Sequence, residues 1–197
     1  HVPVIADAEG GFHDAPNMWR TVRAFEQAGV AAIHIEDHTG TGKHTGLPQK
    51  LRPAAEAAAR IRAAVDARED PDFLVVARTD AFWLSRDLED TIARLQAYAE
   101  AGADMVFPSV VGPAELAAVR SRVGKPVMVV DMPGAPLAAH EGAALVLFYG
   151  LSAYVHFDAL GAALQRFKQS GTFTGRVREF EDFIGYEEFT RRAKKYE

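Results

Sequence analysis

Short apolar runs alternate with amphipathic segments along most of this chain. Six runs rich in valine, alanine, isoleucine and leucine predict strands at residues 2–7, 31–36, 73–78, 104–107, 126–130 and 145–149. The runs are almost continuously apolar, which is typical of parallel strands covered on both faces. Four segments consist of an amphipathic stretch, a glycine and a strand, and their glycines are Gly29, Gly102, Gly124 and Gly142. Glycine readily adopts the left-handed conformation that ends a helix, so each segment predicts a helix followed by a strand.

Polar residues at the ends of the predicted strands help to choose between two α/β architectures. Alternating helices and strands fit either a doubly wound sheet or a (β/α)8 barrel. The carboxyl ends of the first three strands carry six polar residues, namely Asp7, Glu9, Glu36, Asp37, Arg78 and Asp80. TIM barrels gather their chemistry at this end of several different strands. Since no Gly-x-Gly-x-x-Gly sequence opens a helix, a dinucleotide-binding sheet has no support. We therefore expect an α/β fold of the (β/α)8 TIM-barrel type.

The predicted barrel is incomplete. Six βα units are visible, whereas a closed barrel needs eight strands, and the first predicted strand begins at Val2. Two further units would need roughly 60 residues, so we expect that the two N-terminal units are missing. We assign residues 1–170 to the incomplete barrel domain and residues 171–197 to a C-terminal helical extension. Within the extension, residues 171–183 are expected to form a loop, and residues 185–197 a short amphipathic helix that packs elsewhere or on a partner.

The composition excludes several classes of function. The 197 residues are 48% hydrophobic and carry a formal net charge of -5, which fits one globular domain with a sizeable core and disfavours a nucleic-acid surface. There are no cysteines, so disulfides, thiolate metal sites and a cysteine nucleophile are excluded, and the cytoplasm is the expected location. No apolar run approaches the ~20 residues that a membrane helix needs, so no membrane association is expected.

The acidic residues at the strand ends indicate a metal site. Asp7 and Glu9 end the first strand and Glu36 ends the second, and alternation along an extended strand places Asp7 and Glu9 on one face. Carboxylates that converge at one rim are costly unless positive charge lies among them. Mg²⁺, which prefers oxygen ligands, would supply this charge, and Arg78 would offer a planar pair of N–H donors to a substrate carboxylate. The alternative is that these acids cap the following helices and pair with Arg78.

Several segments resemble one enzyme superfamily. The stretches "PVIADAEGGF", "TVRAFEQAGVAAIHIED", "AARIRAAVDAREDPDFLVVARTDA", "AYAEAGADMVFP" and "YGLSAY" are similar to the isocitrate lyase / phosphoenolpyruvate mutase superfamily, and the similarity covers nearly the whole chain. The resemblance implies a (β/α)8 barrel, Mg²⁺, and chemistry on a 2-oxo or 2-hydroxy acid through an enolate of pyruvate type. It also implies a homodimer or homotetramer in which the C-terminal helix is swapped between subunits.

The resemblance implies roles for individual residues by their position. Asp7 and Glu9 match the Asp-x-Asp magnesium pair of the superfamily, with glutamate in place of the second aspartate. Glu36 matches the glutamate that supports the metal through water. Arg78 matches the arginine that grips the substrate carboxylate, so Arg78 and Asp7 are the expected substrate-binding residues. These matches imply that the chain keeps the part of the superfamily site that stabilises the enolate, namely Mg²⁺ and an arginine facing the developing oxyanion.

The polar loop "DHTGTGKHTG" after the second strand supplies two further candidates. A phosphate-binding Walker loop needs Gly-x-x-x-x-Gly-Lys-Ser/Thr, whereas this stretch has Asp37 in place of the first glycine and His44 in place of the hydroxyl residue. In the superfamily this loop is a lid, whose lysine is matched by Lys43 and whose catalytic cysteine is replaced by His44. Lys43 and His44 are therefore the expected catalytic residues beside Arg78, and His44 is either an acid/base group or a solvent-facing lid residue.

Departures from the superfamily narrow the expected substrate. Ser109 and Val155 stand where the methylisocitrate-type lyases carry a glutamate and an arginine, and the loss of such partners disfavours a tricarboxylate. We therefore expect a Mg²⁺-dependent C–C lyase or decarboxylase for a small 2-oxo or 2-hydroxy (di)carboxylic acid, similar to the oxaloacetate decarboxylases. Two alternatives are P–C chemistry of the phosphonopyruvate hydrolase or mutase type, and a barrel that binds an acid without turnover.

Overall fold

The computed structural model describes residues 2–12, 14–40 and 48–196. The chain divides into two compact units, His1–Gly150 and Leu151–Glu197, and each is considered by itself. The catalytic candidates Lys43 and His44 lie outside the described residues.

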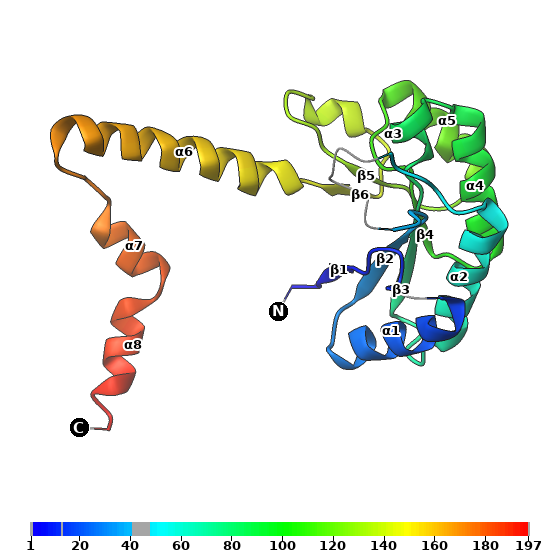
Figure 1. Ribbon diagram of the computed structural model, residues 1–197. Helices are drawn as coiled ribbons and strands as arrows, with labels where there is room; N and C mark the ends of the chain where they lie inside the picture. The colour runs from blue at the N-terminus through cyan, green and yellow to red at the C-terminus, as the bar shows by residue number, and fades with distance from the viewer. Residues whose placement is uncertain (1, 13, 41–47, 197) are drawn as a thin grey trace. The chain divides into compact units, whose positions relative to one another are not determined.

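Six short parallel strands run through the first unit in the order of the chain (Figure 1). One sheet contains β1 (Ile5–Asp7), β2 (Ala32–Glu36), β3 (Leu74–Arg78) and β4 (Met105–Phe107), and β5 (Met128–Val130) pairs with β6 (Leu145–Leu147). An isolated parallel bridge between Val106 and Val127 joins the two groups. A doubly wound sheet would reverse its strand order part-way, whereas this consecutive order is that of a (β/α) barrel. All six predicted strands are confirmed, and the two missing N-terminal units stay a prediction.

Helices cover the outer face of this sheet. They are α1 (Ala15–Gln27), α2 (Ala54–Ala67), the short α3 (Ala81–Ser85), α4 (Leu88–Glu100) and α5 (Pro113–Val123). Figure 1 shows α1, α2, α4 and α5 following one another along one side of the strands, and neighbouring helices in this row contact each other. The core between helices and sheet is apolar and includes Val22, Ile33, Ile61, Val75, Ile92, Leu95 and Val119. This packed layer holds the carboxyl ends of the strands in place.

The segment between β5 and β6 differs from the expected helix. The structure has only a single 3-10 turn there, η1 (Leu137–His140). The preceding stretch contains Pro133 and Pro136. Because proline is tolerated only in the first turn of a helix, Pro136 leaves room for a single turn before Gly142. The glycine predicted to follow the helix, Gly142, still has a positive φ of 87°. The other three predicted helix-ending glycines also have positive φ values and are confirmed.

The second unit is helical. Its helices are α6 (Tyr149–Ser170), which begins at the end of the first unit, α7 (Val177–Phe183) and α8 (Tyr186–Ala193). The predicted C-terminal helix is confirmed by α8. The loop predicted for residues 171–183 is wrong from Val177 onward, because Val177, Phe180 and Phe183 recur at helical spacing in α7. The predicted domain boundary after residue 170 stays a prediction.

Apolar side chains are exposed along this second unit. They include Phe157, Leu160, Leu164, Phe173, Phe180, Phe183 and Phe189. Groups of exposed apolar side chains mark surfaces that bind other proteins or ligands. None of the described helices is both long enough and apolar enough to cross a membrane.

Candidate active site

The carboxyl ends of β2 and β3 bring Glu36 and Arg78 together. Parallel pairing sets Glu36 opposite Arg78 in the register of the two strands, and Nη1 of Arg78 lies 3.4 Å from Oε2 of Glu36. Both side chains are largely buried. Two residues that the sequence singled out separately are therefore in contact at one rim of the barrel.

Two groups besides Glu36 fix the Arg78 guanidinium. Asp80 accepts two hydrogen bonds from one edge of the guanidinium, one from Nε at 2.8 Å and one from Nη2 at 3.1 Å. The ring of Phe107, at the end of β4, has its centroid 5.0 Å from Cζ of Arg78, a distance typical of a cation–π contact. An arginine has five N–H donors, so three remain for other partners after the two bonds to Asp80. Pairing with an acid and donation to a substrate carboxylate are thus compatible.

The charges of Arg78 and Asp80 are stabilised in their ionised forms. Burial alone would lower the pKa of Arg78, but the negative charges of Asp80 and Glu36 outweigh burial and raise this pKa above its ordinary value. Burial would likewise raise the pKa of Asp80, but hydrogen bonds from His38 and Arg78 hold that pKa far below its usual range. Hydrogen bonds and opposite charges favour the charged form of a group, so Arg78 stays cationic and Asp80 anionic.

Asp7 and Glu9 lie at the end of β1, but the side-chain alternation of an extended strand does not place them on one face. β1 ends at Asp7, and Glu9 has a left-handed backbone conformation with φ at 49°. The extended backbone that the same-face prediction assumes therefore stops before Glu9. The carbonyl of Glu9 accepts a hydrogen bond from the Glu36 N–H at 2.8 Å, which places their backbones side by side. The Asp7 carboxylate, with 47% of its side chain exposed, lies 3.6 Å from Nδ1 of His34.

The donors at these strand ends fit a hard divalent cation. The predicted ligands Asp7, Glu9 and Glu36 are all carboxylates, and oxygen donors are what Mg²⁺ prefers. Asp80 and Glu36 contact the guanidinium of Arg78, and the charge of Asp7 also acts on it. A cation would offset the excess of negative charge there. Within the described ranges, no three metal-binding side chains lie close enough to grip one ion directly. Mg²⁺ commonly keeps several waters, so the donor set fits a water-rich site, and the three ligand roles stay a prediction.

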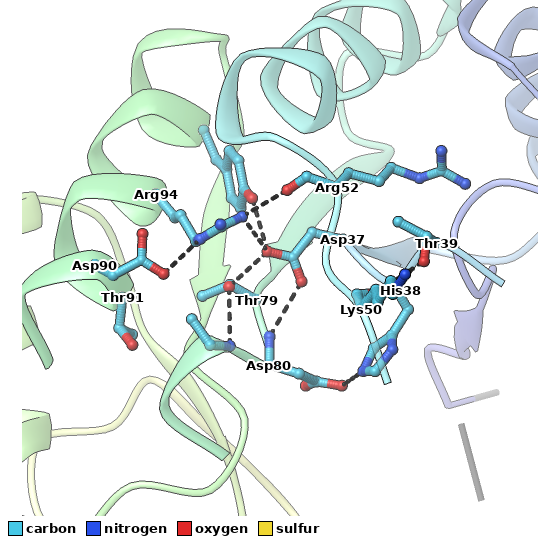
Figure 2. Close-up of polar contacts among 12 residues, drawn as sticks. Asp37, His38, Thr39, Lys50, Arg52, Thr79, Asp80, Asp90, Thr91 and Arg94 are labelled. Carbon is cyan, nitrogen blue, oxygen red and sulfur yellow. Dashed lines mark hydrogen bonds and ion pairs between the residues drawn. The ribbon is translucent and has the colours of Figure 1, made fainter. Parts of the chain in front are cut away.

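Asp37 is the centre of a buried hydrogen-bond network beside this site (Figure 2). Its Oδ2 accepts hydrogen bonds from Thr79 Oγ1 at 2.6 Å and from Tyr98 Oη at 2.9 Å. Nη1 of Arg94 lies 3.3 Å from the same oxygen, and Oδ1 accepts from the backbone N–H of Asp80 at 3.2 Å. Because these partners belong to the end of β3 and to α4, Asp37 joins the end of β2 to both. Sequence reasoning found Asp37 as a strand-end acid but not this network.

The segment that follows β2 is anchored beside the same network. The Thr39 N–H donates to the Lys50 carbonyl at 3.0 Å, and His38 forms an antiparallel bridge with Leu51. Nε2 of His38 lies 2.9 Å from Oδ2 of Asp80. Sequence reasoning did not connect His38 with Asp80, because no motif links the two residues and only the pairing of β2 with β3 brings them together.

Two further polar residues lie past the ends of β4 and β5. Ser109, which follows β4, is buried and hydrogen-bonds Asp80. Asp131 follows β5, and its Oδ1 lies 2.7 Å from Nε2 of the buried His140. The sequence had indicated no role for His140, and its contact with Asp131 holds η1 against the end of β5.

A family model matches most of the chain. The model described as phosphoenolpyruvate phosphomutase matches residues 1–167. This chain belongs to the phosphoenolpyruvate phosphomutase family. The match to the family covers the whole first unit and most of α6. The resemblance to the isocitrate lyase / phosphoenolpyruvate mutase superfamily, indicated by the sequence motifs, is thereby confirmed.

Proteins related to the family align with large parts of the chain. A 2-methylisocitrate lyase of Salmonella typhimurium (strain LT2) is 46% identical over 112 residues, which are 56% of this chain and 38% of that relative. An oxaloacetate decarboxylase of Marinomonas sp. (strain MWYL1) is 36% identical over 141 residues, which are 71% of this chain and 48% of that relative. The chain thus spans about half the length, or less, of these curated relatives.

A solved structure of the family is also similar. The crystal structure of the phosphoenolpyruvate phosphomutase from Streptomyces platensis subsp. rosaceus has a TM-score of 0.88 at 31% sequence identity. The superposition covers 100% of this chain and 74% of that chain. This likeness confirms the predicted α/β barrel class.

Proposed function

We propose that this chain is part of a Mg²⁺-dependent C–C lyase or decarboxylase that acts on small 2-oxo or 2-hydroxy acids with one or two carboxylates. The observation that carries the proposal is the Arg78 guanidinium, which Asp80 fixes beside Glu36 at the carboxyl rim of the strands. The names of two similar proteins, 2-methylisocitrate lyase and oxaloacetate decarboxylase, support the reaction class.

Arg78 would bind the carboxylate next to the reacting carbon. The donors that Asp80 leaves on Nη1 and Nη2 suit a planar carboxylate, with Nη1 shared with Glu36. The raised pKa of Arg78 keeps it charged. Since Asp80 and Phe107 already restrict the side chain, little side-chain freedom is lost when a substrate binds. A fixed positive charge at this position also stabilises the negative charge that develops on the enolate as the neighbouring C–C bond breaks.

Asp7, Glu9 and Glu36 would hold the metal ion at the same rim. When bound, Mg²⁺ would polarise the 2-oxygen of the acid and lower the energy of the developing enolate. The half-exposed Asp7 is accessible to an ion that carries its own waters. Lys43 and His44, outside the described residues, are proposed as the catalytic residues of the loop, with His44 as a proton donor to the enolate.

Ser109 supports a small substrate. Its side chain is buried and engaged with Asp80, so it does not supply the polar partner that glutamate supplies here in the methylisocitrate-type lyases. The carboxylates of Asp7 and Glu36 would repel additional negative charge at this rim. An acid of the size and charge of oxaloacetate therefore fits better than a tricarboxylate.

Cleavage of a P–C bond is the second candidate. It is favoured by the TM-score of 0.88 with a phosphoenolpyruvate phosphomutase. Phosphonopyruvate carries the same carboxylate and 2-oxo group as oxaloacetate, so Arg78 and the metal would bind both in one way. The two reactions differ only in the group that leaves, and product analysis separates them.

A second copy of this chain is the proposed partner. The second unit exposes aromatic side chains along α6, α7 and α8, among them Phe157, Phe183 and Phe189. Water contact with so many apolar groups is unfavourable, which supports a homodimer or homotetramer formed through a swapped C-terminal helix. A cytoplasmic location is part of the same proposal.

A panel of acids tests the function. The full-length protein would be incubated with oxaloacetate, 2-methylmalate and phosphonopyruvate, with Mg²⁺ and again with EDTA, while pyruvate and phosphate are measured. Because free Mg²⁺ itself promotes decarboxylation of oxaloacetate, an Arg78→Ala sample at the same Mg²⁺ concentration is the control. Pyruvate release above this control that EDTA abolishes would support the first candidate, and phosphate release from phosphonopyruvate the second. Binding of oxalate by calorimetry with no turnover of any acid would contradict both and support a barrel that only binds.

A further inference from the structure

We propose that Asp80 is a positioning residue for Arg78, and that His38 and Ser109 hold Asp80 in the orientation this requires. The inference deepens the proposed function and rests on it, because it explains how the carboxylate-binding arginine is kept in place. None of the three residues is expected to touch the substrate.

The Asp80 side chain is oriented toward Arg78 and makes no capping hydrogen bond to α3. It occupies the N-cap position of α3, where an aspartate normally accepts a hydrogen bond from the helix, yet its side chain makes no capping bond. Both carboxylate oxygens face the guanidinium instead, at 2.8 Å and 3.1 Å. The side chain is completely buried, so solvent neither competes with these bonds nor replaces them. Asp80 therefore fixes the edge of Arg78 that includes Nε and leaves the remaining donors pointing elsewhere.

His38 holds Asp80 from the side of β2. Its Nε2 lies 2.9 Å from the same Oδ2 that accepts the Nη2 hydrogen bond of Arg78. Because the ionised Asp80 carboxylate can only accept hydrogen bonds, this contact requires the His38 ring to face it with Nε2 toward Oδ2. The His38 ring is buried and lies 6.4 Å from the Trp83 ring, centroid to centroid, which restricts its rotation. Loss of this ring would free Asp80 to rotate away from Arg78.

Ser109 holds Asp80 from the side of β4. Its backbone is left-handed, with φ at 61°, a conformation that glycine adopts without strain and serine does not. A strained backbone at a buried position points to a use for the side chain. The hydrogen bond to Asp80 is that use. A glycine here would relieve the strain and lose the hydrogen bond, so function and stability would change in opposite directions.

The experiment uses side-chain variants that leave Asp80 itself intact, because removing a buried charge risks unfolding. In His38→Ala the contact to Oδ2 is lost, whereas in His38→Gln the amide nitrogen replaces Nε2 as the donor. Ser109→Gly removes the hydroxyl without filling space. Thr39→Ala is the matched control, because Thr39 is adjacent to His38 but bonds only to Lys50 in the described contacts.

Two readouts are measured on the full-length protein. The first is the ¹⁵N NMR signal of the Arg78 Nε–H group, whose slow exchange with water reports the bidentate contact with Asp80. The second is the affinity for oxalate, a minimal dicarboxylate, in the presence of Mg²⁺, together with KM and kcat for any acid that is turned over. We expect His38→Ala to speed exchange at Arg78 and to weaken oxalate affinity and raise KM about tenfold, with a smaller change in kcat.

The variants then separate positioning from general stability. His38→Gln is expected to restore both readouts to within about twofold of the unchanged protein. Ser109→Gly should weaken oxalate binding without lowering the melting temperature. Folded His38→Ala and Ser109→Gly proteins with unchanged Arg78 exchange and unchanged oxalate affinity would overturn the inference. If no acid is turned over, the proposed function fails, but Arg78 exchange and oxalate binding still decide this inference.

Discussion

Glu36 and Arg78 face each other across the pairing of β2 with β3, with Nη1 of the arginine 3.4 Å from Oε2 of the glutamate. The contact links a predicted metal ligand directly to the predicted carboxylate-binding residue. Because each group influences the charge and orientation of the other, metal and substrate are expected to bind cooperatively at this rim.

Arg78 is expected to be essential for turnover. Arg78→Lys keeps the positive charge but loses the planar set of donors, and we expect it to lower kcat/KM about 10²-fold or more. Arg20→Ala, at an exposed position on α1, is the control and should leave kcat/KM unchanged. Steady-state kinetics on the acid identified in the panel provide the measurement. A lysine variant with unchanged kcat/KM would remove Arg78 from the site.

Magnesium is expected to stabilise the folded protein through Asp7. An ion that binds only the folded state raises the melting temperature as its concentration increases. We expect a saturable increase with Mg²⁺ for the unchanged protein and a much smaller one for Asp7→Asn. Asp72→Asn, at an exposed position before β3, is the charge-matched control. Equal Mg²⁺ responses in both variants would show that the ion binds elsewhere.

Asp37 is expected to contribute strongly to stability. Asp37→Asn replaces a buried carboxylate that accepts from Thr79 and Tyr98 and lies beside Arg94. Removing one partner of a buried charged pair leaves the other charge uncompensated, so we expect the free energy of unfolding to fall by about 3 kcal/mol. Urea denaturation would measure this loss, with Asp72→Asn again as the control. A loss no larger than that of the control would show that the network is dispensable.

Tyr98 is expected to make the protein sensitive to alkaline pH. Burial, and then the negative charge of Asp37, raise the pKa of Tyr98 well above its ordinary value. The folded state keeps the phenol proton when the unfolded state loses it. The contribution of this group is therefore complete below the unfolded pKa of about 10 and is lost as the pH rises above that value toward the folded pKa.

Tyr98→Phe tests this pH dependence. At about pH 8 the variant should be less stable by about 2 kcal/mol, because a hydrogen bond to a charged group is lost. Between roughly pH 9.5 and 11 it should lose less further stability than the unchanged protein, because the titrating group is absent. Urea midpoints across this range provide the measurement, and parallel curves for the two proteins would contradict the assignment.

Most of the fold could be predicted from the sequence because its elements are locally encoded. Continuous apolar runs marked all six strands, and the glycines before them marked the helix ends with positive φ. Two local errors have local causes. The prolines around Gly134 leave only the short η1 where a helix was expected, and α7 replaces part of a predicted loop because its apolar residues have helical spacing.

The site could be predicted only as far as the strand ends identify it. Glu36 and Arg78 follow directly from the positions of β2 and β3, and they do meet. The partners of Asp80 could not be predicted, because His38 and Ser109 come from different strand ends and their contact depends on the packing of three strands. Glu9 could not be oriented either, since its left-handed backbone departs from the alternation of an ideal strand.

Backbone hydrogen bonds anchor both ends of the segment that follows β2. Thr39 is bonded to Lys50, and the N–H of Arg52 donates to the carbonyl of Asp37 at 2.8 Å, so both ends of the intervening stretch are tied to the buried network. Changes of sequence or length between these anchors are therefore expected to leave the contacts that hold β2, β3 and α4 together unchanged. Replacing this stretch would therefore remove the proposed catalytic residues Lys43 and His44 and leave the contacts of Arg78 with Asp80 and Glu36 in place.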